Sequence, residues 1–281
     1  MPDQRPKGPT VAVCVNSPIT PSSQPLIEAW FCSGAAVEVL HTEECPTWPA
    51  PDSYDLVHYR IIHLSDQEYS SDIIKWLGEV PLLSNSLSSI AADRDKLLGG
   101  RLLLEAGLPV PPFIPLNTSA ETSVSKGLLG GPPYICKPVR GGRGDGVVLV
   151  RSVDEALTHQ ERVGRECLLQ RYIPTRRCAR VLCTSETVLA AYAKVTDDIV
   201  ASVTLGAARE EISESEDAIL ELGLSMARAV QGDVVGADIL EAEDGSLWAL
   251  EANTACPGFD PERTDIANIW VDYLIREHLR H

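Results

Sequence analysis

The stretch that most constrains the fold is residues 235–258, VGADILEAEDGSLWALEANTACPG. Two runs of alternating apolar and polar residues, 237–242 and 247–253, flank a break at Asp244-Gly245. Asp-Gly between two such runs is typical of a two-residue type I′ turn, because both central residues of that turn need a positive φ. The pattern therefore predicts an antiparallel β-hairpin here.

This turn also predicts which residues face one another across the hairpin. The opposed pairs are Asp238 with Glu251, Leu240 with Ala249, and Ala242 with Leu247. Because side chains alternate across a strand, Asp238, Glu251 and Asn253 share one face. Opposed carboxylates repel each other at ~5 Å, and a cation between them would make the net interaction attractive. Two carboxylates and an amide oxygen suit Mg²⁺ or Mn²⁺; the alternative is a solvated hairpin end with its charges splayed apart.

Composition narrows the class of protein. The 281 residues carry 40 acidic and 24 basic side chains, a net charge of −16, which argues against a nucleic-acid partner. No apolar run approaches the ~20 residues of a membrane span, and the N-terminus MPDQRPKGPT lacks a signal core, so we expect a cytoplasmic protein without membrane contact. None of the eight cysteines forms a CxxC pair, so structural zinc is not expected.

The N-terminal third alternates strand and helix patterns. Apolar or β-branched runs predict strands at 10–16, 35–40, 54–60 and 81–85, and helices at 24–33 and 66–77. Such alternation predicts a parallel sheet with right-handed crossovers. The turn after the first strand reads NSPITPSS rather than GxGxxG, so a dinucleotide site is not expected there.

The remainder of the chain reads as a linker and two further units. A helix at 88–107 is interrupted at Gly99-Gly100, hairpins are predicted at 134–151 and 180–194, and long helices at 213–230 and 265–280. We predict four segments: an N-terminal α/β domain at 1–90, a linker helix at 91–117, a central lid subdomain at 118–173 and a C-terminal subdomain at 174–281. The fold class is thus mixed α/β, or α+β.

A glycine-rich loop at 140–146 is the second informative feature. Glycines let backbone N–H groups approach an anion closely, so a loop of this kind between strands suits polyphosphate. Lys137 leads into the loop from a strand, where its ammonium group is a point charge for phosphate. No GK[ST] follows, which excludes a Walker loop. The alternative is a flexible hairpin loop with incidental basic residues.

Taken together, these features resemble the ATP-grasp superfamily, in particular the RimK-like carboxylate–amine ligases. The resemblance spans about residues 93–258. The matching segments occur in the family's order: RDKLLGGRLLLEAGLPVP, YICKPVRGGRGDGVVLV, LLQRYI, ARVLCTSETVLAAYAK, GADIL and ALEANTACPG. It implies an ATP-grasp fold of three subdomains: a parallel-sheet preceding domain, a central lid, and a C-terminal antiparallel sheet with helices.

The resemblance implies a nucleotide site. Lys96 and Lys137 are expected to contact the α- and β-phosphates of ATP; a solvated helix lysine is the plainer alternative for Lys96. The mobile loop over the phosphates comprises Gly142, Arg143, Gly144, Asp145 and Gly146. The adenine-reading hinge comprises Gln170, Arg171, Tyr172 and Ile173, chiefly through backbone groups.

It also implies a metal and catalytic site. Asp238, Glu251 and Asn253 are expected to hold Mg²⁺ or Mn²⁺, two ions in all, which bridge the phosphates of ATP. Arg180 is expected to stabilise charge on the transferring phosphoryl group and on the acyl phosphate. A surface ion pair is the alternative for Arg180.

The implied reaction is ATP-dependent amide-bond formation from a carboxylate and an amine through an acyl phosphate, with ADP and phosphate released. The substrates would be small molecules, for example amino acids, or a peptide or carrier-bound acceptor, and similar enzymes are often homo-oligomers. One alternative keeps the fold with kinase- or carboxylase-like phosphoryl transfer. Another is a non-catalytic nucleotide-binding protein.

The chain departs from the family's pattern at three places. Arg171 stands where many relatives carry an acidic hinge residue, and residues 176–179 hold no carboxylate for the ribose hydroxyls. The segment after Lys194 lacks the basic and Asn residues expected to face phosphate and substrate, with Ser202 and Thr204 near those positions. These departures leave the substrates open.

Overall fold

A computed structural model describes residues 8–62, 71–117, 120, 124, 127–142, 144–195, 208–212 and 216–279. The chain divides into two compact units. The first comprises Met1–Ile90, Gln231–Val234 and Thr254–His281; the second comprises Ala91–Val230 and Val235–Asn253. The subdomain boundaries at residues 117 and 173 stay predictions. Within the described ranges, every helix falls short of the length and apolarity that a bilayer crossing needs.

The first unit contains the predicted parallel sheet. Its strand order is β2-β1-β3-β4, with every pair parallel. The strands are β1 (Thr10–Val15), β2 (Ala36–His41), β3 (Leu56–Arg60) and β4 (Leu83–Ser84). Residues 11–15 of β1 are at most 1% exposed, as expected of a strand covered on both faces.

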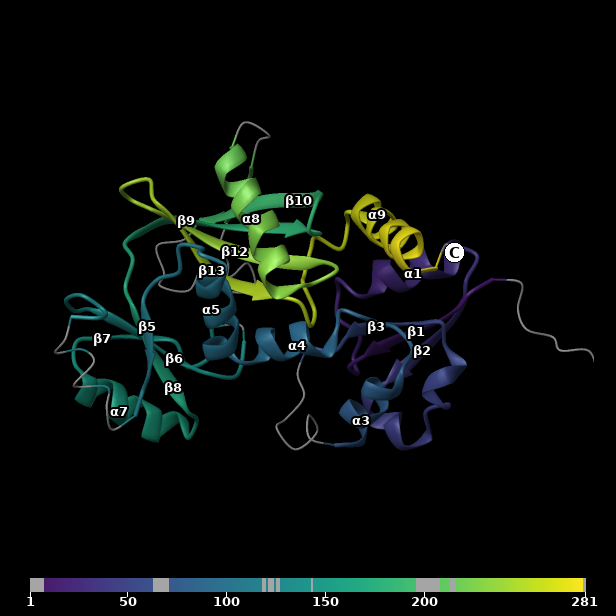
Figure 1. Cartoon of the computed structure of the whole chain (residues 1–281), viewed down its shortest axis with the longest axis horizontal. Helices are drawn as coiled ribbons and strands as arrows, with labels where there is room; N and C mark the ends of the chain where they lie inside the picture. Colours follow the sequence, from purple (N-terminus) through teal and green to yellow (C-terminus); the bar gives the residue numbers. More distant parts are fainter. Residues whose placement is uncertain are drawn as a thin grey trace, which may run out of the picture. The chain divides into compact units, whose positions relative to one another are not determined.

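Helices flank this sheet. They are α1 (Gln24–Cys32), α3 (Asp72–Glu79) and α9 (Thr264–Leu274), with 3-10 turns at Thr42–Thr47 and Pro51–Ser53 and a π-helical end at Ile275–Leu279. α1 and α9 pack against each other, as Figure 1 shows. The first part of the helix predicted at 66–77 lies outside the described residues, and α3 is its remainder.

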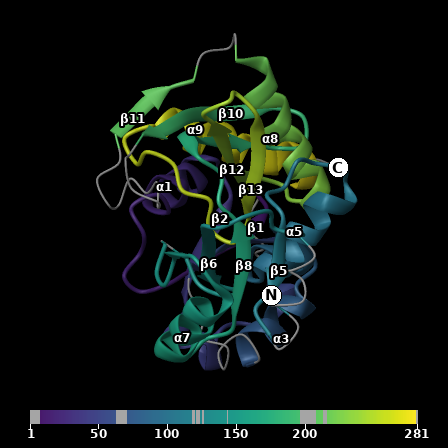
Figure 2. The same cartoon turned by 90° about the vertical axis from the view of Figure 1, so that its left-hand side faces the viewer.

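The second unit holds two antiparallel sheets. The four-stranded sheet has the order β5-β8-β6-β7, formed by β5 (Phe113–Pro115), β6 (Tyr134–Pro138), β7 (Val148–Val150) and β8 (Cys167–Arg171). Helix α7 (Val153–Val163) covers one face and contributes Val153 and Ala156 to its core (Figure 2). The 134–151 hairpin is confirmed, whereas the short strand β5 had no sequence signal.

The five-stranded sheet has the order β11-β10-β9-β12-β13. Its strands are β9 (Thr175–Cys183), β10 (Val188–Val195), β11 (Ala208–Glu211), β12 (Val235–Ala242) and β13 (Leu247–Asn253). Helix α8 (Asp217–Val230) lies over the apolar face, as Figure 1 shows, and Gly223 there packs so closely that a Cβ would lie 2.7 Å from Val181. The opposite face of β9 and β12 carries Arg180 and Asp238.

The linker helix differs from its prediction. The break falls at Asp95, which separates α4 (Leu87–Arg94) from α5 (Lys96–Glu105), and not at Gly99-Gly100. The Asp95 carboxylate caps α5 by accepting from the N–H groups of Leu97 and Leu98 at 3.0 Å. The two glycines lie inside α5, and close packing explains their lack of a side chain: a Cβ would lie 2.5 Å from the Ala92 carbonyl at Gly99 and 2.7 Å from the Phe113 ring at Gly100.

The hairpin of β12 and β13 is confirmed, but with a different turn. Asp238 does face Glu251, whereas Ala249 faces Ile239 and Leu247 faces Glu241, one residue away from prediction. The turn has three residues rather than two, and of the Asp-Gly pair only Gly245 has a positive φ, 83°. A bulge at Leu250 then restores the pairing of Asp238 with Glu251.

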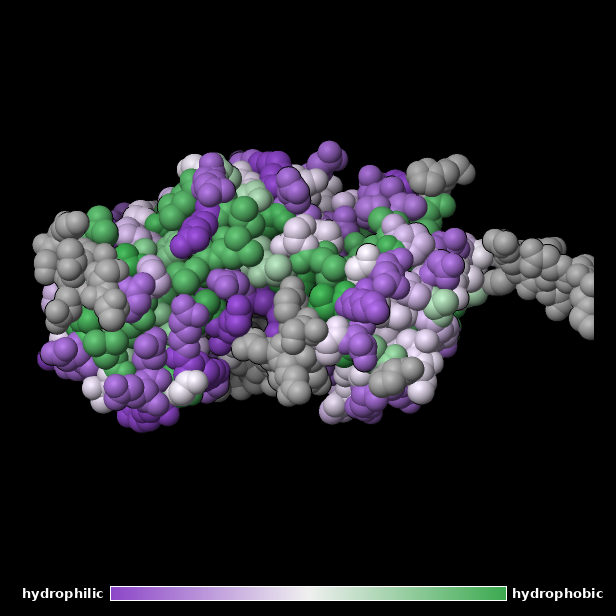
Figure 3. Space-filling view, turned by 60° about the horizontal axis from the view of Figure 1, so that its bottom comes forward, coloured by the Kyte–Doolittle hydropathy of each residue, from purple (hydrophilic) through white to green (hydrophobic). Residues whose placement is uncertain are grey.

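Polar and apolar side chains share the surface. On the face shown in Figure 3, hydrophilic side chains are spread over both units, with apolar areas between them. Six large apolar side chains are exposed among the described residues: Phe31, Leu98, Leu104, Leu128, Leu149 and Ile269.

Candidate active site

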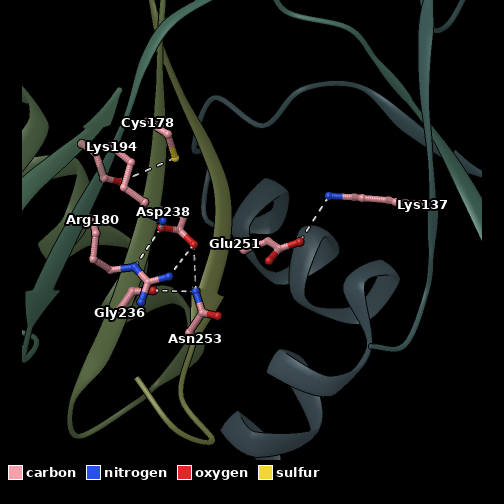
Figure 4. A network of polar contacts seen from close by, with 9 residues as sticks. Lys137, Cys178, Arg180, Lys194, Gly236, Asp238, Glu251 and Asn253 are labelled. Carbon is pink, nitrogen blue, oxygen red and sulfur yellow. Dashed lines mark hydrogen bonds and ion pairs between the residues drawn. The ribbon is translucent and has the colours of Figure 1, made fainter. Parts of the chain in front are cut away.

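Asp238 is the centre of a buried ion-pair network on the five-stranded sheet (Figure 4). Arg180 lies opposite it on the neighbouring strand β9 and donates Nε to Oδ1 at 2.8 Å and Nη2 to Oδ2 at 2.7 Å. Lys194 on β10 donates Nζ to Oδ1 at 2.9 Å. Burial favours the neutral acid, but the two cations outweigh it and hold the pKa of Asp238 well below its usual range. The carboxylate is therefore ionised.

Asn253 completes the contacts of Asp238. Its Nδ2 donates to the Gly236 carbonyl at 2.9 Å and to Oδ2 of Asp238 at 3.2 Å. Because the amide nitrogen makes both bonds, the amide oxygen is the atom that remains for a cation. The predicted set of Asp238, Glu251 and Asn253 thus lies together where the last residues of β13 pair with the first half of β12.

Glu251 pairs with a different cation, Lys137 of the four-stranded sheet. The Lys137 Nζ lies 3.4 Å from Oε1 of Glu251, and the two side chains point toward each other in Figure 4. The Lys137 side chain is 7% exposed and that of Glu251 is 34% exposed. Burial lowers the pKa of Lys137, although the negative charge of Glu251 opposes this shift. Burial alone would raise the pKa of Glu251, but the positive charges of Lys137 and Lys96 hold that pKa below its usual range.

Two side chains from outside the glycine loop form hydrogen bonds to it. Lys96 Nζ donates to the Gly141 carbonyl at 2.6 Å, and Arg165 Nη2 donates to Oδ2 of Asp145 at 2.7 Å. Gly144 and Gly146 have φ values of 74° and 75°, a region that favours glycine. Gly142 is described, but Arg143 lies outside the described residues. Lys96 thus contacts the glycine loop at Gly141, directly before the residues 142–146 that were predicted to cover the phosphates.

The first two residues of the predicted hinge, Gln170 and Arg171, make hydrogen bonds to backbone carbonyls of other segments. The Arg171 N–H donates to the Pro112 carbonyl at 2.8 Å, and the Arg171 Nε donates to the Leu129 carbonyl at 3.0 Å. Gln170 is 5% exposed and its Nε2 donates to the Pro111 carbonyl. Tyr172 and Ile173 follow directly after β8, which ends at Arg171.

A small cavity brings several of these residues together. Its lining includes Lys96, Lys137, Gln170 and Glu251, together with Gly100 and Phe113.

Among the described residues, four cations act on two carboxylates in this region, and Asp93 also lines the cavity. The cations are Arg180, Lys194, Lys137 and Lys96, and the carboxylates are Asp238 and Glu251. Such a group of cations suits a polyanionic ligand.

Lys194 is the residue that the sequence analysis missed. It ends the apolar run VLAAYAK and pairs with Cys178, while Tyr192 pairs with Arg180. Strand alternation therefore places Lys194 and Arg180 on the same face of the sheet. The available signal was a single lysine at the end of an apolar strand. On the predicted hairpin, this lysine lies two residues along from the position that faces an arginine of the partner strand.

Comparisons with known proteins agree with this geometry. A family model described as the RimK-like ATP-grasp domain matches residues 93–274. Over 213 residues the chain is 34% identical to the ribosomal protein bS6–L-glutamate ligase of Escherichia fergusonii, covering 71% of this chain and 69% of that protein.

Solved structures share the fold. A RimK domain protein from Sphaerobacter thermophilus has a TM-score of 0.71 at 16% identity, covering 93% of this chain and 98% of that one. The ATP-grasp ligase PsnB, complexed with a minimal precursor, Mg and ADP, has a TM-score of 0.66 at 20% identity, covering 96% and 98%. Because the family model matches well over half of the chain, the protein belongs to the RimK-like ATP-grasp family.

Proposed function

We propose that the residues around Asp238 and Lys137 carry the reaction of this chain, which is an ATP-dependent carboxylate–amine ligase. The observation that supports this most strongly is the group of four cations around two buried or half-buried carboxylates beside a cavity. An ATP molecule with magnesium supplies negative charge for these cations to bind.

In this proposal the nucleotide phosphates lie against Lys96 and Lys137. The buried ammonium of Lys137 has Glu251 at 3.4 Å, longer than a strong charge-assisted bond, so phosphate oxygens can improve its pairing. Residues 142–146 of the glycine loop cover the phosphates and exclude water that would hydrolyse an acyl phosphate. The N–H groups of Tyr172 and Ile173 meet the adenine edge, with Gln170 and Arg171 as the supporting part of the hinge.

Asp238, Glu251 and Asn253 are the proposed holders of Mg²⁺ or Mn²⁺, two ions in all. Their oxygen atoms fit these hard cations. Among the described residues, no three His, Cys, Asp or Glu side chains are grouped as metal ligands, so two carboxylates and one amide would need phosphate and water oxygens to complete a shell. When bound, the metal neutralises charge on the phosphoryl oxygens.

The proposed reaction has two steps. A substrate carboxylate oxygen attacks the γ-phosphorus of ATP, the bond to the β–γ bridging oxygen breaks, and an acyl phosphate and ADP form. An amine then attacks the acyl carbon, loses a proton and expels inorganic phosphate, which leaves an amide. Arg180 is proposed to stabilise negative charge on the transferring group, and positioning supplies most of the remaining rate enhancement.

The substrate classes follow from the named relatives. One is a glutamate ligase for a ribosomal protein, and PsnB was solved with a precursor peptide. We therefore propose an amino acid, with L-glutamate as the first candidate, as the amine, and a protein or peptide carboxylate as its acceptor.

The test is ATP turnover by the full-length chain against a panel of amino acids and carboxylate-bearing peptides, with mass detection of the amide. We expect ADP and phosphate release that depends on both substrates, and a product heavier than the acceptor by one amino-acid residue. Glu251→Gln is the matched inactive control. ADP formation without an amide would support kinase-like chemistry instead, and ATP binding without ADP under any combination would support a non-catalytic nucleotide-binding protein.

A further inference from the structure

The contacts of Asp238 leave no oxygen lone pair readily open to a metal. Oδ1 accepts from Arg180 Nε and Lys194 Nζ, and Oδ2 accepts from Arg180 Nη2 and Asn253 Nδ2. A carboxylate oxygen offers about two acceptor sites, so each is fully used. A metal ion can coordinate Asp238 only after one of these donors leaves.

Lys194 is the donor that can leave most easily. Arg180 makes two parallel bonds to Asp238 and lies directly opposite it on the adjacent strand, a geometry that adds both energy and specificity. Lys194 makes one bond, comes from the next strand over, and has a flexible four-carbon stem. Asn253 is a neutral donor at 3.2 Å, so its departure would not relieve the repulsion between Lys194 and an arriving cation.

Release of Lys194 has a cost that depends on what else is present. Its side chain is 8% exposed, and within the part of the chain that the structure describes its one ion pair is with Asp238. A metal that takes Asp238 alone would leave a buried ammonium without a counter-ion beside a second cation, which is strongly unfavourable. If phosphate oxygens arrive with the metal, Lys194 has a new anionic partner and the cost disappears.

We propose that Lys194 is an exchangeable counter-ion that occupies Asp238 in the free protein and makes metal binding conditional on phosphate binding. The proposal rests on the proposed role of Asp238 as a metal ligand. Its consequence is a positive coupling between metal and nucleotide that this lysine creates. By linkage, the metal must raise nucleotide affinity by the same factor as the nucleotide raises metal affinity.

The test is Mn²⁺ binding to the full chain, measured by electron paramagnetic resonance with and without ADP. We expect weak Mn²⁺ binding to the wild-type protein alone and much tighter binding with ADP. In Lys194→Met, Mn²⁺ alone should bind about tenfold tighter or more, and the coupling with ADP should fall by a similar factor. Lys194→Arg should keep the coupling, and Lys75→Met on the exposed face of α3 controls for a lost positive charge.

The outcomes separate this inference from the proposed function. If folded Lys194→Met binds Mn²⁺ with unchanged affinity, the proposed role of Lys194 is wrong. If, in the same experiments, ADP-dependent Mn²⁺ binding is abolished by Glu251→Gln, the proposed metal site still holds. Absence of ADP-dependent Mn²⁺ binding in the wild type would overturn both. Lys194→Gln serves as a second neutral variant if the methionine variant does not fold, as judged by circular dichroism.

Discussion

Asp238 and Arg60 are two buried charges that look alike in the sequence and differ in the structure. Each is a single charged residue in an apolar strand, GADIL and VHYRII, and they are 7% and 0% exposed. Asp238 is paired with two cations. Arg60 donates to Oγ of Ser22, Oγ of Ser23 and the Pro257 carbonyl at 3.0–3.3 Å, and lies 5.0 Å from the Trp270 ring.

No described carboxylate pairs with Arg60, and burial lowers the pKa of its guanidinium. Its fixed hydrogen bonds instead join three parts of the first unit: strand β3, the turn before α1, and the segment around Pro257. Ion pairs around Asp238 can be exchanged for a ligand that brings its own charges. Bonds from Arg60 to neutral oxygens have no such replacement, so we interpret Arg60 as structural and the Asp238 network as functional.

The largest expected effect comes from the two carboxylates. Both Asp238→Asn and Glu251→Gln should reduce ADP release about 10²-fold or more, because each removes a charge that positions the reacting phosphate. Their stabilities should differ. Asp238→Asn strands two buried cations and should lower the free energy of unfolding by about 3–5 kcal/mol. Glu251→Gln leaves the single buried cation Lys137 beside a neutral amide oxygen in place of a contact that is already 3.4 Å long, so it should cost less, about 1–3 kcal/mol.

Turnover assays and urea unfolding of the same preparations measure both quantities. If Glu251→Gln turns over ATP at a near-normal rate, the metal assignment is wrong. If Asp238→Asn is as stable as the wild type, its pairing with Arg180 and Lys194 does not stabilise the fold.

Removal of the Arg60 guanidinium tests the other half of the comparison. Arg60→Met should lower the free energy of unfolding by about 2–4 kcal/mol, because three oxygen acceptors lose their donor in a buried environment. ADP affinity should not change, since the proposed nucleotide residues lie in the other unit. Arg60→Lys keeps the charge but cannot reach all three acceptors, so an intermediate loss is expected.

Urea unfolding and ADP titration calorimetry are the measurements. An Arg60→Met protein more stable than the wild type would show that the uncompensated buried charge costs more than its hydrogen bonds contribute, and the structural interpretation would fail.

Local patterns in the sequence predicted most of the fold, since apolar periodicity and Gly or Pro breaks report directly on strands and helices. The opposition of Asp238 and Glu251 was predicted correctly although the turn was not. A three-residue turn shifts the register by one residue, and the bulge at Leu250 shifts it back. The bulge also turns Ala249 and Ala252 into the apolar core while Glu251 stays on the polar face, and nothing in a strict alternation reveals it.

The rest depended on contacts between segments distant in the sequence. Gly99 and Gly100 predicted a helix break, yet they lie within a helix, and they are glycines because Ala92 and Phe113 approach them too closely for a side chain. Lys194 joins Asp238 from 44 residues away, through the pairing of three strands. Such neighbours are set by tertiary structure, which short-range patterns do not encode.

The smallest expected effect concerns a third kind of charge pair, in which the charge itself depends on pH. His278 Nε2 lies 3.1 Å from Oδ1 of Asp233, and both side chains are about one-fifth exposed. The hydrogen bond to Asp233 raises the pKa of His278 despite partial burial, with a further contribution from Glu277. A raised folded-state pKa means that the pair stabilises the protein fully below the unfolded-state value of about 6.5, and that this stabilisation is lost as pH rises through the folded-state pKa.

Asp233→Asn should therefore lower the free energy of unfolding by about 1 kcal/mol or less at pH 5.5 and by less still at pH 8.5. Urea unfolding of both proteins at the two pH values isolates the pair, because every other titrating group is common to both. A cost that grows with pH would mean that His278 is neutral in the folded protein and that Asp233 acts on some other cation.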